Sequence, residues 1–298
     1  MLQPLYTKHV QRFLPPLKIH TWGGLGSQLF AVAICADLRR RFPGRTIQIV
    51  LHTGGVTRRV PEVVELFSDF RYIYQEDFWS LANSSESNPK STNADIRAHV
   101  KNILLRIGFI SHCNDDLSTE KLRPWVLSLR GHYSFRSISP DFLADLKRLI
   151  LSKEFSTPNT NESSCCIHYR LGDLLTLSEK EPISSRSVLS EFKAIQKHYD
   201  FSKLIVFSDS PVEAKKRFST AETQPLEVPN SSTTQVIANS VHADYFIGTS
   251  SKISFWIAAI RAVVDQSQSS LPRINVTQFK GLVRGHTELI NLYETDLE

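Results

Sequence analysis

The stretch SSCCIHYRLGD, residues 163–173, runs from a short apolar segment into three polar side chains that can carry chemistry. Its first five residues have the composition of a buried β-strand. His168, Arg170 and Asp173 therefore stand where a strand gives way to a loop. Open α/β sheets bind ligands at the carboxyl ends of their strands, and arginine can grip a phosphate in two places at once. The alternative is a strand end capped by a surface ion pair.

The second half of the chain repeats this order of strand and helix. Strands are expected at Cys165–His168, Leu204–Phe207 and Tyr245–Gly248, and helices at Val188–His198, Val212–Phe218 and Ile253–Val264. Strands that alternate with helices predict a doubly wound parallel sheet.

The first half begins with a similar unit. A strand at Leu17–Thr21, a glycine loop, a helix over Ser27–Arg41 and a strand at Thr46–Leu51 follow one another. This β-loop-α-β order predicts a second parallel sheet. Helices are also expected at Ile96–Ile110 and Pro140–Leu151, and a loop at Ser80–Asn93.

The polar segment 156–163 is the best candidate for an interdomain linker. We therefore expect an N-terminal α/β domain over residues 1–155 and a C-terminal Rossmann-like domain over residues 156–280. Residues 281–298 are expected to end in a helix that packs back on the first domain.

Composition and charge exclude several classes of protein. The chain has 298 residues, of which 41% are hydrophobic and 22% charged, so it can bury a large core. Its net charge of +5 suits an anionic ligand or weak association with an acidic membrane surface. It has no dense Lys/Arg tract, zinc-finger spacing or aromatic RNP pattern, which argues against a nucleic-acid partner.

The cysteines and the N-terminal residues indicate the cellular compartment in which the protein is expected. Four cysteines without C-x-x-C spacing predict neither a structural zinc nor a disulfide framework. The first twenty residues resemble neither a signal peptide nor a membrane span. We expect a cytoplasmic protein, with peripheral contact to the inner face of the membrane as an option.

The glycine loop GGLGSQ, residues 23–28, lies between the first strand and the first helix. Glycines let the backbone approach a ligand closely, and helix N-terminal amides favour anions. The loop is neither a Walker motif nor G-x-G-x-x-G, so a dinucleotide is not expected. A plain tight turn is the alternative. The candidate ligand-binding residues are Gly24, Gly26, Ser27 and Gln28.

Two further strand ends carry small polar residues. Ser208 and Asp209 follow one strand, and Asp209 is a candidate to accept hydrogen bonds from a sugar or from Arg170. Another strand runs into a helix start rich in hydroxyls, which can cradle a phosphate. The alternative for both is an ordinary helix cap. The candidates at the second helix start are Thr249, Ser250, Ser251 and Lys252.

Taken in order, these motifs resemble those of the α1,2-, α1,6- and protein O-fucosyltransferases. Their G-G-L-G-N-Q motif is matched at residues 23–28, with Ser27 for Asn, and their H-x-R-R-x-D motif at residues 168–173, with Leu171 for the second Arg. Their S-D motif resembles residues 207–209. Their last motif, an A-D strand running into hydroxyl residues, resembles residues 243–254.

The resemblance implies a GT-B-like α/β fold, with two Rossmann-like domains facing a central cleft and the acceptor on the N-terminal side. It implies an inverting transferase that needs no metal ion and takes a nucleotide-sugar such as GDP-fucose as its co-substrate. Arg170 would bind the donor diphosphate, His168 would touch the nucleotide or orient Arg170, and Asp173 would pair with Arg170. Ser250 and Ser251 would receive phosphate oxygens. The acceptor would be a glycan or a lipid-linked oligosaccharide in polysaccharide biosynthesis.

Departures from the family pattern keep alternatives open. Relatives carry a nucleobase-reading Asp before the last motif, where this chain has Thr233-Thr234-Gln235-Val236. A transferase using a non-GDP sugar and a catalytically inactive nucleotide- or glycan-binding relative therefore remain alternatives. The catalytic base is not assigned. The candidates for it are Asp69, Glu76, Asp77, Asp115, Asp116 and His20.

Overall fold

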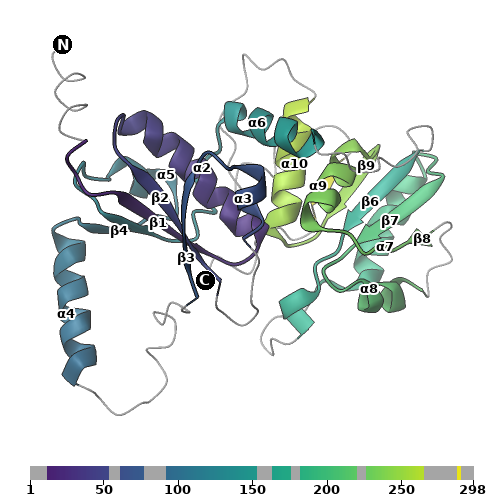
Figure 1. Cartoon of the computed structure of the whole chain (residues 1–298). Helices are drawn as coiled ribbons and strands as arrows, with labels where there is room; N and C mark the ends of the chain where they lie inside the picture. Colours follow the sequence, from purple (N-terminus) through teal and green to yellow (C-terminus); the bar gives the residue numbers. More distant parts are fainter. Residues whose placement is uncertain are drawn as a thin grey trace. The chain divides into compact units, whose positions relative to one another are not determined.

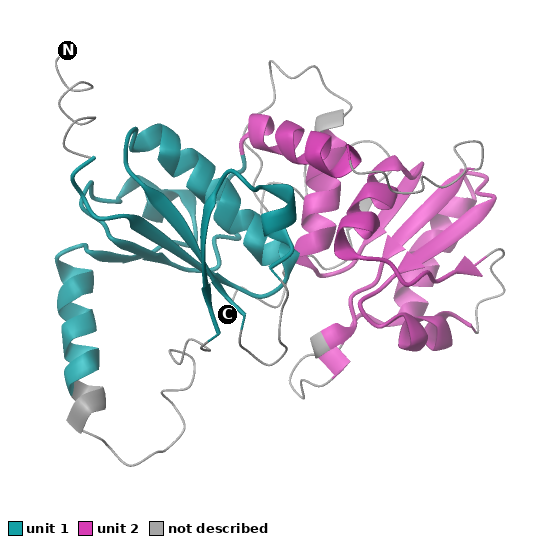
Figure 2. Cartoon of the chain, viewed as in Figure 1, with its two compact units in different colours: residues 1–138 teal, residues 139–298 magenta. Residues whose placement is uncertain are grey.

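The computed structural model describes residues 12–53, 61–76, 92–152, 163–175, 182–219, 226–264 and 287–289. The chain divides into two compact units, Met1–Ile138 and Ser139–Glu298 (Figure 2). Each unit is built on a five-stranded sheet in which every pairing is parallel (Figure 1). The predicted α/β class with two parallel sheets is confirmed.

The first unit has the strand order β3-β2-β1-β5-β4. Most residues of β1 and β2 are buried, as expected for parallel strands covered on both faces. The predicted first strand, helix and second strand of this unit are confirmed. Its elements are β1 (Leu17–Trp22), α2 (Leu25–Arg41), β2 (Ile47–His52), α3 (Val63–Leu66), β3 (Arg71–Gln75), α4 (Thr92–Arg106), β4 (Ile110–His112), α5 (Asp116–Glu120) and β5 (Ser128–Arg130).

The second unit has the strand order β10-β9-β6-β7-β8. The three strands and three helices predicted for it are confirmed to within a few residues at their ends. Its elements are α6 (Pro140–Leu151), β6 (Ser164–His168), the 3-10 turn η1 (Gly172–Leu175), α7 (Ser185–Gln196), β7 (Lys203–Phe207), α8 (Pro211–Phe218), β8 (Leu226–Glu227), α9 (Thr233–His242), β9 (Tyr245–Gly248), α10 (Lys252–Val264) and β10 (Thr287–Leu289).

Both sheets reverse their strand order at the first strand of the unit. The chain leaves β1 toward β2 and β3, while β5 and β4 lie on its other side. The chain likewise leaves β6 toward β7 and β8, while β9 and β10 lie on its other side. In open α/β sheets such a reversal opens a crevice at the carboxyl ends of the two strands concerned, and ligands bind there.

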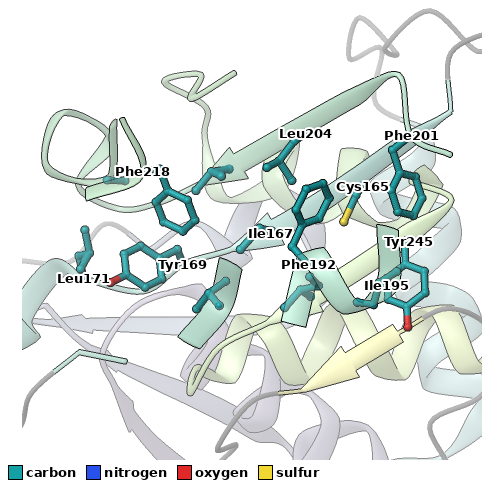
Figure 3. Packing of buried hydrophobic residues seen from close by; sticks show 14 residues of the cluster. Cys165, Ile167, Tyr169, Leu171, Phe192, Ile195, Phe201, Leu204, Phe218 and Tyr245 are labelled. Carbon is teal, nitrogen blue, oxygen red and sulfur yellow. The ribbon is translucent and has the colours of Figure 1, made fainter. Parts of the chain in front are cut away.

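One face of the second sheet packs into an apolar core that continues beyond the end of β6. Cys165, Ile167, Tyr169 and Leu171 all belong to this core (Figure 3). Because extended residues alternate between the two faces, His168 and Arg170 point away from it. Leu171 is fully buried there, with Tyr169 packed against Phe218 of α8. Leu171, which stands where the fucosyltransferase motif has a second arginine, is therefore part of this apolar core.

The boundary between the units differs from the expected 155/156. Contacts place it between Ile138 and Ser139, so α6 belongs with the second unit. The ring of Phe142 in α6 lies edge-on to Trp256 of α10, with centroids 6.0 Å apart. The apolar stripe of α6 therefore completes the second core. The expected linker, apart from Ser163, lies outside the described residues.

Three other expectations need correction or fall outside the described residues. Thr287–Leu289 is not helical and does not join the first domain, because it forms β10 and pairs with β9 in the second sheet. The rest of 281–298 lies outside the described residues. The helix expected over 96–110 ends at Arg106, and Gly108, with φ +80°, leads into β4. Of the expected loop at 80–93, only Thr92 and Asn93 are described, and they begin α4.

None of the helices that the structure describes is long and apolar enough to cross a bilayer.

Candidate functional site

Arg170 lies at the strand-order reversal of the second sheet, just beyond β6. Its backbone N–H donates to the hydroxyl of Thr249 (3.0 Å), which in turn donates to the carbonyl of His168 (2.9 Å). The backbone N–H of Thr249 donates to the same carbonyl (3.1 Å). A single threonine thus fixes the backbone of Arg170 against the turn that leads from β9 into α10.

The turn after β9 has the predicted hydroxyl residues, but two of them are engaged in the fold. Thr249 makes the contacts just described. Ser251 caps α10, because its hydroxyl accepts from the N–H of Ile253 (3.1 Å) and its carbonyl accepts from that of Phe255 (3.1 Å). Both side chains are buried, whereas Ser250 and Lys252 are half-buried. The positive end of the α10 dipole therefore begins beside Arg170, where it favours an anion.

Asp209 positions the loop that carries Arg170. One of its oxygens, Oδ1, accepts from the N–H groups of Leu171 (2.9 Å) and Gly172 (2.8 Å). The sequence predicted that Asp209 would bind a sugar or Arg170, and that Asp173 would hold this loop. The side chain of Asp173 lies outside the described residues, and Asp209 does the holding.

Ser208 acts within its own turn. Its hydroxyl accepts from the N–H of Ser210 (3.1 Å), just before Pro211 begins α8. Because Ser208 follows the strand neighbouring β6, this turn delivers Asp209 to the carboxyl edge of the sheet. The alternative for Ser208 was an ordinary helix cap, but the N-cap of α8 is Ser210 and makes no side-chain cap hydrogen bond.

His168 is buried and neutral. Its Nδ1 lies 2.7 Å from the hydroxyl of Ser254 on α10. Burial, opposed by the Asp209 carboxylate and helped by the Arg170 guanidinium, lowers the pKa of His168 to about 4. Near neutral pH the ring is therefore a hydrogen-bonding group without charge, and Ser254 fixes its orientation. Such a group fits the predicted part of orienting Arg170 or touching a ligand.

The glycine loop lies at the corresponding reversal in the first sheet, directly after β1. Gly23 has φ +90°, a conformation that favours glycine. Gly24 is the N-cap of α2 at an ordinary φ of −75°, and a Cβ added there would meet nothing within 4 Å. Neither the backbone conformation nor the packing of the protein explains why residue 24 is glycine. Glycine is accepted at an N-cap, and the close approach of a ligand to Gly24 stays a prediction.

Gln28 shapes the glycine loop from within. Its Nε2 donates to the carbonyl of Gly23 (3.0 Å), and its Oε1 accepts from the N–H of Val63 at the start of α3 (3.1 Å). The side chain is buried. Gly26 is likewise buried in the first turn of α2, and Ser27 is half-buried. Gln28 thus holds the glycine loop in shape, and its contact with a ligand stays a prediction.

A histidine pair near the carboxyl edge of the first sheet was only partly anticipated. His20 Nδ1 lies 2.9 Å from His52 Nε2, and both rings are buried. Burial, with the Arg130 guanidinium and His52 nearby, lowers the pKa of His20 to about 3. The Tyr133 hydroxyl donates to the His20 carbonyl (2.7 Å). Sequence reasoning named His20 as a candidate base but missed its partner, because residues 20 and 52 are brought together only by strand pairing.

The carboxylates named as candidate bases are divided by the structure. Asp115 caps α5 by accepting from the N–H of Ser118 (2.7 Å), and Asp116 accepts from the N–H of Ser137 (3.1 Å). Both therefore have structural roles. Asp69 and Glu76 are exposed, and Asp77 lies outside the described residues.

Within the described part of the chain, no three His, Cys, Asp or Glu side chains gather so that they could hold a metal ion. The four cysteines are buried free thiols.

Comparison with solved structures finds similar chain paths at low sequence identity. A glycosyl transferase family 9 protein from Veillonella parvula is 11% identical with a TM-score of 0.43, over 93% of this chain and 86% of that one. The E. coli heptosyltransferase WaaC, solved with ADP, is 11% identical with a TM-score of 0.44, over 92% of both chains. The α-1,6-fucosyltransferase NodZ, soaked with GDP-fucose, is 10% identical with a TM-score of 0.41, over 82% and 92%.

No known family's sequence profile matches the chain, and no curated protein matches it in sequence. The function proposed below therefore rests on this chain's own residues and on the resemblance of its motifs.

Proposed function

We propose that the protein is a nucleotide-sugar-dependent glycosyltransferase of the fucosyltransferase type. It would move fucose or a related deoxysugar to a hydroxyl of a glycan or lipid-linked glycan, by inversion and without a metal ion. The observation that carries the proposal is the position of Arg170. Its backbone is fixed at the strand-order reversal of the second sheet, beside the positive end of α10.

This position suits the cleavage of a sugar–phosphate bond. As that bond breaks, negative charge builds up on the departing diphosphate. Arg170 and the amides at the start of α10 can offer positive charge and hydrogen-bond donors there, from a backbone that is held in place before the reaction begins. Thr249 and Asp209 hold the loop on both sides of Arg170, so little reorganisation is needed as charge develops. His168, which is neutral, adds a hydrogen-bonding group but no further positive charge.

The donor base is the finer part of the proposal. GDP-fucose follows from the motif resemblance alone. Fucosyltransferases have an Asp that reads the nucleobase before the last motif. The corresponding segment of this chain is the start of α9 and has no carboxylate. There the Gln235 side chain accepts from the N–H of Ser232 (2.9 Å) in a capping box. Because Gln235 is engaged in this capping box, the segment offers no carboxylate to select guanine, and the nucleotide base is determined by the experiment that follows.

Thermal unfolding with a panel of nucleotides tests the donor. GDP, UDP, ADP, CMP and dTDP are compared at equal concentration, because a ligand that binds only the folded state raises the unfolding midpoint. We expect one base to stand out, and its sugar conjugate to be consumed when glycan acceptors are added. If no nucleotide shifts the midpoint, the proposal is wrong.

Arg170→Ala tests the mechanism. We expect turnover to fall by roughly 10²–10³-fold while the unliganded unfolding midpoint stays unchanged. Arg186→Ala on α7 is the matched control, because Arg186 is exposed and follows no strand end. Unchanged turnover in Arg170→Ala would contradict the proposed role. Nucleotide binding by the wild-type protein without any transfer would identify an inactive binding relative instead.

A further inference from the structure

Helix α4 presents an apolar face that the first unit leaves exposed. Its side chains are described from Ile96 onward, and every residue from Ile96 to Val100 is exposed. The helix leads into β4, the edge strand of the first sheet (Figure 1). Helical stability in proteins comes mostly from packing an apolar face, so an exposed helix of this kind requires a partner.

The exposed apolar residues form one continuous stripe. Ile96, Val100, Ile103 and Ile107 are between 42% and 60% exposed. Their spacing of four, three and four residues places them on one side of the helix. Scattered exposed apolar residues are ordinary on protein surfaces, but a contiguous row marks a surface used for binding.

The charges around this stripe are mainly basic, because α4 contains a single carboxylate, Asp95, just before Ile96. Residues 96–107, IRAHVKNILLRI, contain Arg97, Lys101 and Arg106 and no carboxylate. Arg97 and Lys101 fall on one flank of the stripe and Arg106 on the other, at 100° per residue. A helix with an apolar stripe between basic flanks is suited to the boundary between acyl chains and anionic headgroups.

An indole extends the stripe where the helix ends. Trp125 is 40% exposed, and its Nε1–H donates to the carbonyl of Ile107 (3.0 Å). The guanidinium of Arg123 lies 5.4 Å from the centroid of the same indole. Tryptophan is enriched at membrane interfaces, because its ring is apolar and its N–H is polar. Trp125 and Arg123 thus add one more apolar group and one more cation to the surface.

We infer that α4, together with Trp125 and Arg123, lies in the interfacial layer of a membrane rich in anionic lipid. A second copy of this chain is the less suitable occupant, because pairing two such helices would bring six cations together with only two carboxylates, one Asp95 from each helix. The inference concerns a surface of the first unit and does not depend on the proposed transferase activity.

Vesicle sedimentation with the full-length protein tests the inference. Binding to phosphatidylcholine vesicles is compared with binding to vesicles that also contain phosphatidylglycerol, at low and high salt. We expect binding only to the anionic vesicles, and we expect salt to weaken it because salt screens exposed charges. Absence of binding to anionic vesicles at low salt would overturn the inference.

Two sets of matched variants assign the binding to α4. The triple variant R97Q/K101Q/R106Q should bind anionic vesicles roughly 100-fold more weakly, at about fivefold per cation. The control K193Q/K197Q/K216Q removes three exposed cations from α7, its C-cap and α8 of the second unit and should bind like the wild type. Ile103→Ser should also weaken binding, whereas Val212→Ser, at a residue 86% exposed on α8, should not.

Two outcomes would contradict this assignment. Equal losses in the α4 triple variant and its control would mean that only net charge matters. A soluble dimer that Ile103→Ser dissociates would mean that a second copy covers the stripe.

Discussion

The carboxylate of Asp209 occupies the space that a side chain at residue 172 would need. A Cβ built on Gly172 would lie 2.1 Å from Asp209 Oδ2, while Oδ1 of the same carboxylate accepts from the N–H of Gly172 (2.8 Å). A larger residue at position 172 would therefore have to displace this carboxylate. The Asp209 carboxylate thus holds the loop that carries Arg170, in a position that a side chain at residue 172 would block.

This relationship predicts strong coupling between the two positions. Gly172→Ala should displace the carboxylate, and Asp209→Ala should leave the Leu171 and Gly172 amides without this acceptor, at a cost of about 1–3 kcal/mol each. The double variant should lose clearly less stability than the sum of the two, because one change removes what the other disturbs. Chemical denaturation of the wild type, the two single variants and the double variant measures this coupling as a double-mutant cycle. Additive losses would show that the residues act independently.

Gly24 should behave in the opposite way. Gly24→Ser places a Cβ in open space and a preferred residue at the N-cap of α2, so the free energy of unfolding should stay level or rise slightly. Nucleotide affinity or turnover should nevertheless fall if glycine is there for a ligand. Thermal unfolding with and without nucleotide measures both effects. Unchanged affinity and turnover would reduce the loop to a plain turn between β1 and α2.

Gln28 should contribute to stability through its two buried hydrogen bonds. Gln28→Leu would leave the Gly23 carbonyl and the Val63 N–H without their side-chain partner, which should lower the free energy of unfolding by roughly 2 kcal/mol. The matched control is Gln196→Leu, at an exposed residue that ends α7, and it should change stability little. Denaturant titration of both variants decides, and equal small losses would contradict a structural role for Gln28.

His168 should make the stability of the second unit dependent on pH. Its pKa is about 4 in the folded protein and 6.5 as the ordinary value, so the unfolded chain takes up the proton first. Stability from this group is therefore lost as the pH falls from 6.5 toward 4. Between pH 7 and pH 5 the loss should be about 2 kcal/mol.

Comparison with His168→Gln isolates this effect from the protonation of His20 and the carboxylates, which both proteins share. The variant should lose less stability than the wild type over the same pH range. His198→Gln, at an exposed histidine that follows α7, should retain the wild-type pH dependence. Parallel pH profiles of the wild type and His168→Gln would contradict the burial of a neutral ring.

Local pattern was sufficient for the elements of both sheets that lie next to the candidate site. The apolar run of β6, the glycines before α2 and the hydroxyl residues before α10 determine conformation through neighbours in the sequence, and the elements predicted from them are confirmed. The short strands β4, β5 and β8 were missed, because three residues or fewer carry too little periodicity to be seen.

By itself, the sequence determined that two α/β sheets would form and that polar motifs would stand at their strand ends, because hydrophobic period and turn chemistry are local properties. Only the tertiary structure decided what each polar residue does. Asp209 holds a loop, Gln28 ties together two turns, and His20 pairs with His52, because those partners lie about thirty or more positions apart in the chain. A side chain's hydrogen bonds depend on which strands lie side by side, and strand order is fixed by the packing of the whole unit.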